Sequence, residues 1–336
     1  MKVPFVNFGK QYEEHKYEFD EAIKRVLSGG NLILREDVEE FERNFADFLG
    51  VKYVVGVNSG TDALYLALKA LEIGFEDEVL VSSHTFVASI QVINQLGATP
   101  VLYDLEEDLK IGKKTKVIML CHISGELDHN LVPALNIGLP IVEDACQALG
   151  AELEGKKAGT MGDIGAFSFY PAKLLGCFGD GGALVTDNED IYEEVKELRN
   201  HYKKDYSKWG INSRLDNLQA AVLNIRLKYL SQILERRKQI AERYLQEINI
   251  DKIRIKLPAY SEGRVWQDFI LYSCLRDELF SFLKFHGIET MKNEYPFPIE
   301  KLPKSAEYEE NTLRIPCNET LTDSEVDYII KNINKF

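Results

Sequence analysis

The sequence is poor in the features that mark secreted, membrane-bound and nucleic-acid-binding proteins. Its five cysteines include no CxxC pair and its six histidines have no metal-ligand spacing, so we expect reduced, mostly buried thiols and no metal site. A net charge of −14 argues against binding to a nucleic-acid backbone. No apolar run approaches membrane-spanning length, and no signal peptide is recognisable. These absences predict a cytoplasmic protein without nucleic-acid or membrane partners.

What remains is the composition of an ordinary globular enzyme-sized chain. Its 336 residues are 45% hydrophobic, which is ample for a packed core. The length and the alternating strand and helix patterns predict an α/β fold with two domains. We place a large domain at 1–235, including an N-terminal arm at 1–15, and a smaller C-terminal α+β domain at 236–336.

Several helices can be predicted from apolar spacing and end signals. Apolar residues recur at helical spacing over 19–27, where Gly29 and Gly30 follow, and over 38–48, where Gly50 is a plausible C-cap. The same criteria predict one long helix over 216–234 and a final helix over 323–333.

The stretch Gly162–Asp187 organises the rest of the chain. It is interpreted as a strand over 166–169, a loop carrying Lys173, a glycine-rich turn and a second strand over 183–186. Aromatic and apolar neighbours, among them Tyr170, surround the loop. Partial desolvation disfavours the ammonium form of Lys173 and frees its amine to form a Schiff base. The alternative is an ordinary hairpin with a surface lysine.

Two strand-to-helix turns add candidate binding residues. A β-branched strand over 53–57 leads into Ser59-Gly60-Thr61 at a helix N-terminus, which favours a phosphate through free N–H groups and the helix dipole. The alternative is that Ser59 and Thr61 are simple N-caps. Phe86 falls in the loop after the strand at 79–82, where an aromatic ring can stack on a flat ligand; packing in the core is the alternative.

Asp144 ends an apolar strand over 140–143. A lone buried carboxylate is costly and needs a partner. The alternative is that Asp144 caps a helix.

The stretch FSFYPAKLLGCFGDGGALVTD resembles the lysine segment of the pyridoxal-phosphate (PLP) sugar aminotransferases of the DegT/DnrJ/EryC1/StrS family, and the resemblance runs from about Val3 to the C-terminus. It implies an aspartate aminotransferase-like fold with a mostly parallel central sheet flanked by helices. It also implies that Lys173 holds PLP as an internal aldimine. The other implied cofactor contacts are Ser59, Gly60, Thr61 and Ser168 to the phosphate, Phe86 to the ring face, Asp144 to the pyridine nitrogen and Gln147 beside the phenolic oxygen.

The resemblance further implies a homodimer with shared active sites. The segment NSRLDNLQAAVL matches a family pattern whose asparagine, here Asn212, reaches the cofactor phosphate of a neighbouring subunit. Arg214 and Tyr170 are candidate substrate-binding residues. Taken singly, Asn212 and Arg214 would by default be interpreted as a helix cap and a surface charge.

The family pattern is altered at several places, and the Gly-Pro pair that is usual near Arg35-Glu36 is absent. Glu126 stands where an amide is usual, four residues after His122, which we interpret as a structural histidine. The segments 105–117 and 295–312 are shorter than the family usually shows.

The predicted function is transfer of an amino group from an amino acid, by resemblance L-glutamate, to a keto sugar on a nucleotide. The resemblance allows C3 as the aminated carbon and amino-sugar supply for cell-surface glycans such as the O-antigen of lipopolysaccharide. One alternative is a PLP-dependent sugar dehydratase, although relatives with that activity replace the lysine by histidine. The other is a non-catalytic nucleotide-sugar sensor on the same fold.

Overall fold

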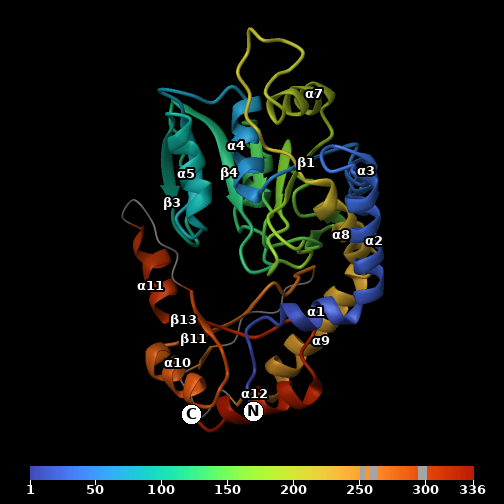
Figure 1. Cartoon of the computed structure of the whole chain (residues 1–336). Coiled ribbons are helices and arrows are strands. Elements are labelled where there is room, and N and C mark those ends of the chain that lie inside the picture. Colours follow the sequence, from blue (N-terminus) through green and yellow to red (C-terminus); the bar gives the residue numbers. More distant parts are fainter. Residues whose placement is uncertain (250–254, 257–262, 294–300) are drawn as a thin grey trace.

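A seven-stranded sheet forms the centre of the larger part of the molecule (Figure 1) in the computed structural model, which describes residues 1–249, 255–256, 263–293 and 301–336. The strand order is β1-β9-β8-β5-β4-β2-β3. Neighbours from β8 to β3 are parallel, whereas β9 runs antiparallel to both β1 and β8. The strands are β1 (Tyr53–Val57), β2 (Glu78–Ser82), β3 (Thr99–Tyr103), β4 (Thr115–Cys121), β5 (Ile141–Asp144), β8 (Ile164–Ser168) and β9 (Gly182–Thr186).

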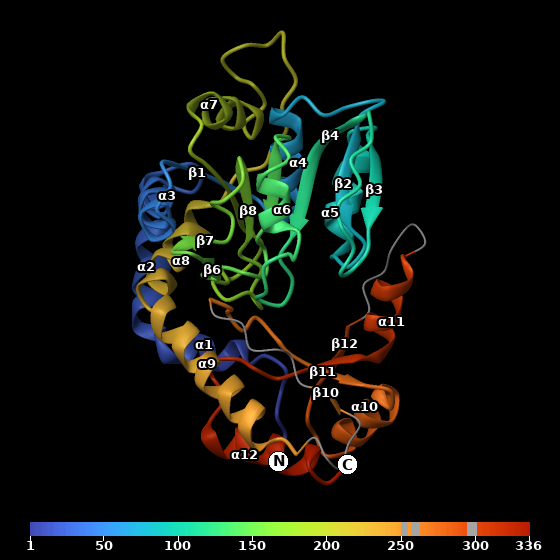
Figure 2. The ribbon, with the colours of Figure 1, turned by 180° about the vertical axis from the view of Figure 1, so that it is seen from behind.

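Both faces of this sheet are buried, which explains why its strands are apolar runs rather than alternating patterns. Val54 and Val55 are successive residues of β1, and each packs in a different core cluster on its own side of the sheet. Helices α4 (Gly60–Ala70), α5 (Val87–Gln95) and α7 (Glu189–Leu198) cover the face of Val55. Helices α3 (Glu36–Leu49) and α8 (Asn217–Lys228) cover the face of Val54, and α6 (Leu131–Leu135) lies on the side seen in Figure 2.

A four-stranded antiparallel sheet forms the smaller part, in the order β10-β11-β13-β12. Its core contains residues of α9, α10, α12 and the strands β11 and β13. The elements of this part are α9 (Leu230–Glu247), β10 (Ile255–Lys256), β11 (Phe269–Ser273), α10 (Arg276–Phe285), β12 (Met291–Lys292), α11 (Pro303–Asn311), β13 (Thr312–Ile315) and α12 (Asp323–Ile333). The final helix has the predicted bounds, with Thr322 and Glu325 forming a capping box at its start.

The N-terminal segment belongs to this smaller part. Val3 forms a bridge with Ile288 and is fully buried in the small core, and both chain ends lie there (Figure 1). Helices α1 (Phe8–Glu14) and α2 (Lys16–Gly29) then lead to the larger part. Gly30 and Gly50 end α2 and α3 in the left-handed conformation, as the sequence predicts.

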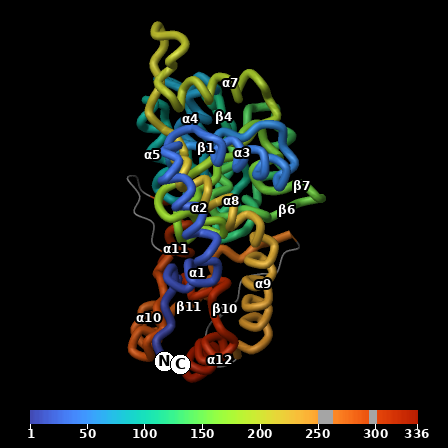
Figure 3. Tube along the Cα trace, turned by 45° about the vertical axis from the view of Figure 1, so that its right-hand side comes forward, coloured from blue at the N-terminus to red at the C-terminus, as the bar shows by residue number. Residues whose placement is uncertain are grey.

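The predicted long helix over 216–234 is wrong, because the structure breaks it at Tyr229. The hydroxyl of Tyr229 donates to Glu18 at 2.6 Å, and its ring stacks on His15 at 3.8 Å. These contacts tie Tyr229 to the N-terminal helices at the residue where α8 ends and α9 begins. The following helix, α9, descends from the larger part to the smaller one (Figure 3) and passes through the predicted domain boundary at 235–236.

Two connections bear on the shortened segments. Residues 105–114 contain no helix, in agreement with the sequence-based expectation. In the segment 295–312, residues 295–300 lie outside the described residues, and α11 begins at Pro303. A short hairpin, β6 (Glu152–Leu153) and β7 (Lys156–Lys157), follows β5. No helix in the described part of the chain has both the length and the apolar character needed to cross a bilayer.

Candidate active site

The predicted site residues gather at one edge of the large sheet. The strands β1, β8, β5, β4 and β2 point in the same direction, so their carboxyl ends meet there. Ser168 is the last residue of β8, and Asp144 ends β5 opposite Cys121 of β4. The loop of Lys173 follows β8, so a lysine, a carboxylate and small hydroxyl residues lie at this edge.

The turn after β1 forms the expected helix N-terminus. Ser59 is the N-cap of α4, and its hydroxyl accepts a hydrogen bond from the amide of Asp62 at 3.1 Å. Ser59 is therefore an N-cap, as the alternative interpretation predicts. It leaves the amides of Gly60 and Thr61 in the first turn, where the helix dipole favours an anion.

Gly60 is required where three segments converge. A Cβ at this position would lie 2.7 Å from Sγ of Cys146 and 2.8 Å from Cβ of Ser168. On the other side, a Cβ on Gly182 would lie 2.3 Å from the carbonyl carbon of Ser59. Gly60 thus allows the start of α4 to approach the end of β8 and the turn after β5, and Gly182 allows it to approach the start of β9. The predicted phosphate residues Ser59, Gly60 and Ser168 are neighbours in space.

Asp144 is a buried carboxylate, 6% exposed, that no cation among the described residues pairs with. Its Oδ2 accepts from the hydroxyl of Ser89 at 2.8 Å, and its Oδ1 from the amide of Cys146 at 3.2 Å. Burial first, and then the charge of Asp144, raises the pKa of the Cys121 and Cys146 thiols well above the usual range. The carboxylate therefore remains available to a cationic group that enters the site.

The charge of Lys173 acts on Cys146, as that of Asp144 does. It opposes the increase in the pKa of Cys146 that burial and Asp144 cause. The backbone amide of Lys173 donates to the carbonyl of Tyr170 at 2.8 Å, which closes a tight turn. The apolar residues around the loop are buried as expected, but Tyr170 is 53% exposed.

Phe86 and Gln147 occupy different surroundings. Phe86 precedes α5 and is 46% exposed, so it is not a core residue as the alternative required. Gln147 is buried, and its Oε1 accepts from the amide of Ser124 at 3.0 Å. Since this bond engages the amide oxygen, the NH₂ group of Gln147 is the end left to donate.

Asn212 and Arg214 lie just before α8. The N-cap of that helix is Asp216, so the capping interpretation of Asn212 is not what the structure shows. Asn212 is exposed, as an approach to a second subunit would require. Arg214 is half-buried and donates from Nη1 to Oδ1 of Asn200 at 3.4 Å.

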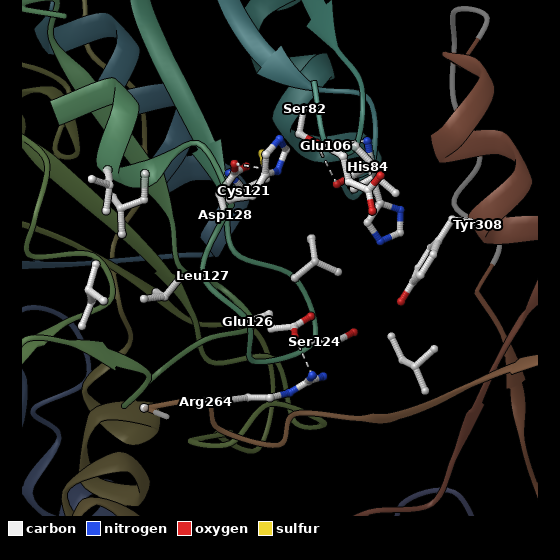
Figure 4. Close-up of a pocket in the computed structure, with 18 of the residues that line it drawn as sticks. Ser82, His84, Glu106, Cys121, Ser124, Glu126, Leu127, Asp128, Arg264 and Tyr308 are labelled. Carbon is white, nitrogen blue, oxygen red and sulfur yellow. Dashed lines mark hydrogen bonds and ion pairs between the residues drawn. The ribbon is translucent and has the colours of Figure 1, made fainter. Parts of the chain in front are cut away.

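A cleft of about 560 Å³ opens between the two parts of the molecule (Figure 4). His84 and Tyr308 line it and pack edge to face, with ring centroids 4.9 Å apart, and Ser124 borders it from the large part. At its lower wall Arg264 donates to Glu126 at 2.6 Å (Figure 4). The glutamate that replaces the usual family amide is thus matched by an arginine from the smaller part.

His122 is a structural residue, as predicted. It is fully buried, its Nδ1 accepts from the amide of Asp128 at 3.0 Å, and its Nε2 lies 2.9 Å from Oε2 of Glu143. Both ring nitrogens are therefore satisfied away from the cleft.

Sequence reasoning missed residues that act through distant contacts. Ser89 donates a hydrogen bond to Asp144. The hydroxyl of Ser213 accepts one from the amide of Asn58 at 3.1 Å, next to the turn that begins α4. Gln267 contacts the loop of Lys173 from the smaller part. A serine in a helix or a glutamine before a strand carries no local signal of such roles.

Comparison with known proteins identifies close relatives over the whole chain. The sequence model of the DegT/DnrJ/EryC1/StrS aminotransferase family matches residues 13–334. The dTDP-3-amino-3,4,6-trideoxy-alpha-D-glucose transaminase of Streptomyces venezuelae is 41% identical over 322 residues, covering 91% of this chain and 85% of that protein. The dTDP-3-amino-3,6-dideoxy-alpha-D-galactopyranose transaminase of Aneurinibacillus thermoaerophilus is 36% identical, and 99% of each chain is covered.

The fold agrees with a solved structure of the same kind. DesV from S. venezuelae, crystallised with a ketimine intermediate, superposes with a TM-score of 0.93 at 38% identity, covering 99% of this chain and 98% of that one. The fold and the family resemblance predicted from the sequence are confirmed. The predictions of a PLP cofactor and of a sugar aminotransferase are confirmed as well.

Proposed function

The chain belongs to the DegT/DnrJ/EryC1/StrS aminotransferase family, and on this basis we propose that it transfers an amino group from L-glutamate to a keto sugar carried on a nucleotide. The observation that carries the proposal is the meeting of Asp144, the N-terminus of α4 and the Lys173 loop at one sheet edge. Each of these supplies one of the contacts that a phosphorylated pyridine aldehyde needs.

The residues present fit PLP. The start of α4 offers backbone amides to a dianionic phosphate, and the absence of side chains at Gly60 and Gly182 keeps its neighbours close. Asp144 is buried without a cation among the described residues, which suits a protonated ring nitrogen. The free NH₂ end of Gln147 suits the phenolic oxygen, and the exposed ring of Phe86 suits the flat face.

The roles of the protein groups follow from their chemistry. When bound, PLP supplies an electron sink for the bond that breaks at the α-carbon of the amino acid. Lys173 would bind the cofactor through Nζ and, once displaced by the amino acid, accept the α-proton on the same nitrogen. Asp144 would hold a proton on the ring nitrogen, and Ser59, Thr61 and Ser168 would orient the phosphate.

The finer assignment rests on the relatives. Both transaminases described above carry a 3-amino sugar on dTDP in their names, so we assign C3 as the aminated carbon and a nucleotide-linked sugar as the acceptor. We further propose a cytoplasmic homodimer in which Asn212 contacts the partner's cofactor phosphate and Arg214 and Tyr170 the substrate. The exposure of Asn212 supports the first of these roles. The product would serve amino-sugar supply for cell-surface glycans such as the O-antigen.

The test is a product assay that separates the alternatives by mass. Enzyme loaded with PLP is incubated with L-glutamate and a panel of 3-keto and 4-keto nucleotide sugars. Transamination replaces the keto oxygen by an amine and releases one equivalent of 2-oxoglutarate, whereas a dehydratase removes water. Binding of a sugar nucleotide without either product would identify the sensor alternative and contradict the proposal. Lys173→Ala is expected to abolish product formation.

A further inference from the structure

One side-chain amide grips the backbone on both sides of Lys173. Oε1 of Gln267 accepts a hydrogen bond from the amide of Leu174 at 3.1 Å. Nε2 of the same residue donates to the carbonyl of Ala172 at 3.0 Å. Gln267 is 8% exposed, so water competes little for either bond. No other side chain among the described residues contacts both peptide groups that flank the lysine.

The side-chain amide of Gln267 pairs with this backbone in the way that a neighbouring strand would. A primary amide has a donor and an acceptor side by side, as a backbone peptide group does. Gln267 pairs with the carbonyl before Lys173 and with the amide after it. It therefore fixes both peptide planes that meet at the Cα of Lys173. The direction of the Cα–Cβ bond, and hence the start of the lysine side chain, follows from those planes.

Gln267 is itself held from the smaller part of the molecule. The backbone carbonyl of Gln267 accepts a hydrogen bond from Nη1 of Arg237 at 3.0 Å. Arg237 in turn pairs with Glu319 through Nη2 at 2.8 Å. Both charged side chains are almost fully buried. The preceding residue, Trp266, packs in the small core. A rigid buried group therefore anchors the amide that grips the lysine loop.

We propose that Gln267 is a positioning residue that orients Lys173 toward the cofactor and the reacting carbon. The inference rests on the proposed role of Lys173. Gln267 acts through the backbone of Ala172 and Leu174 and exchanges no proton with substrate. Through Arg237 it also ties the loop of the larger part to the core of the smaller part.

Gln267→Met tests the proposal, because methionine keeps the length and loses both hydrogen bonds. Misplacement of a reacting group by about 1 Å costs on the order of 10²-fold in rate. We therefore expect a reduction of kcat by roughly that factor, with KM much less affected. In cofactor-free protein we expect faster hydrogen–deuterium exchange at the amide of Leu174. Gln239→Met on the exposed side of α9, where the amide binds only Glu235, is the matched control and should change neither readout.

Gln267→Glu is the second variant, should the methionine variant not fold. An ionised carboxylate still accepts from Leu174 but cannot donate to Ala172, so exchange at Leu174 should remain slow while kcat falls. Wild-type kcat in either folded variant would overturn the proposal. So would unchanged exchange at Leu174 in a folded methionine variant, whatever its activity.

Failure of the proposed function would look different. In that case borohydride treatment of PLP-loaded wild-type protein would leave no pyridoxyl group on the peptide containing Lys173. Protection of the Leu174 amide by Gln267 would still be measurable in the cofactor-free protein. In contrast, the wild-type protein could carry the pyridoxyl adduct while Gln267→Met forms that adduct at the wild-type rate and keeps the wild-type kcat. This result would refute only the positioning role of Gln267.

Discussion

Ser89 donates its hydroxyl hydrogen to Oδ2 of Asp144 at 2.8 Å, from the first turn of α5 to the end of β5. The hydroxyl of Thr85 lies 2.9 Å from that of Ser89, so the contact is part of a short buried chain. The chain fixes one oxygen of the carboxylate, while the amide of Cys146 fixes the other. Asp144 therefore has a set orientation before any ligand arrives.

Ser89→Ala should reduce activity while Asp144 is still present. A hydrogen bond to a charged group contributes roughly 1.5–3 kcal/mol, and about 1.4 kcal/mol corresponds to a tenfold change. We expect about a tenfold decrease in kcat/KM, together with weaker retention of PLP on dialysis. Ser281→Ala on the exposed face of α10, whose hydroxyl bonds only to its own helix, is the control. Unchanged kcat/KM in the Ser89 variant would mean that the carboxylate needs no such support.

Gly60→Ala should weaken cofactor binding. The added methyl would meet Cys146 at 2.7 Å and Ser168 at 2.8 Å, so the start of α4 must shift. Overpacking of this kind costs about 1–3 kcal/mol, and we expect an increase in the Kd of PLP of at least about tenfold, measured by absorbance titration of the apoprotein. Gly29→Ala, where nothing lies within 4 Å of the new methyl, should leave the Kd unchanged. An equal change in the Kd of PLP in both variants would contradict a role of the start of α4 in binding the cofactor.

The local parts of the site could be predicted because they are written in contiguous residues. The apolar strand ending in Asp144 and the turn at Ser59 each combine a run of β-branched residues with a change to small polar ones. Such a change marks the end of a strand, and at Ser59 it also marks the start of a helix, whereas β5 is followed by a turn. The bounds of β1 agree with the prediction for the same reason.

The supporting contacts could not be predicted because they join residues far apart in the chain. Gln267 reaches Leu174 over 93 positions, and Ser89 reaches Asp144 over 55. The helix break at Tyr229 is of the same kind. Local propensity favours a continuous helix there, and nothing near Tyr229 in the sequence indicates that its side chain contacts Glu18 of another helix.

The pair of Glu143 and His122 should make stability depend on pH in the acidic range. Burial raises the pKa of Glu143, but hydrogen bonds from His122 and from the amides of Gly159 and Gly162 outweigh it, so the pKa lies below its ordinary value of 4.5. A carboxylate with a depressed pKa contributes stability above its unfolded value, and this contribution is lost as the pH falls through the folded value. We expect the free energy of unfolding to decrease below about pH 4.5.

Glu143→Gln should remove that dependence at a cost to stability. The amide cannot accept all the bonds that the carboxylate accepts from buried N–H groups. Breaking a buried charged contact costs about 3–5 kcal/mol, which denaturant unfolding at pH 7 would measure. Repeating the measurement at pH 4 should give a smaller difference from wild type. Glu40→Gln on the exposed face of α3 is the control, and an equal difference at both pH values would contradict the assignment to Glu143.

Asp104 should control the docking of α11 against the larger part. Its carboxylate accepts from the amides of Lys304 and Ser305 at 2.8 Å each, and so caps the first turn of a helix that belongs to the other part. Burial raises the pKa of Asp104, but these bonds and one from the Ser305 hydroxyl lower it below its usual range. The cap is therefore a charged one at neutral pH.

Asp104→Asn should loosen α11 and the cleft wall that it carries. Losing a charged cap costs about 1–2 kcal/mol, so Tm should decrease. Tyr308 reaches the cleft from α11. We propose this cleft as the place of the keto sugar, so KM for that substrate should rise several-fold while kcat changes less. Asp108→Asn, an exposed position four residues along, should alter neither value. If KM stays at the wild-type value while Tm falls, α11 is a structural clip only, and the wall formed by Tyr308 takes no part in holding the sugar.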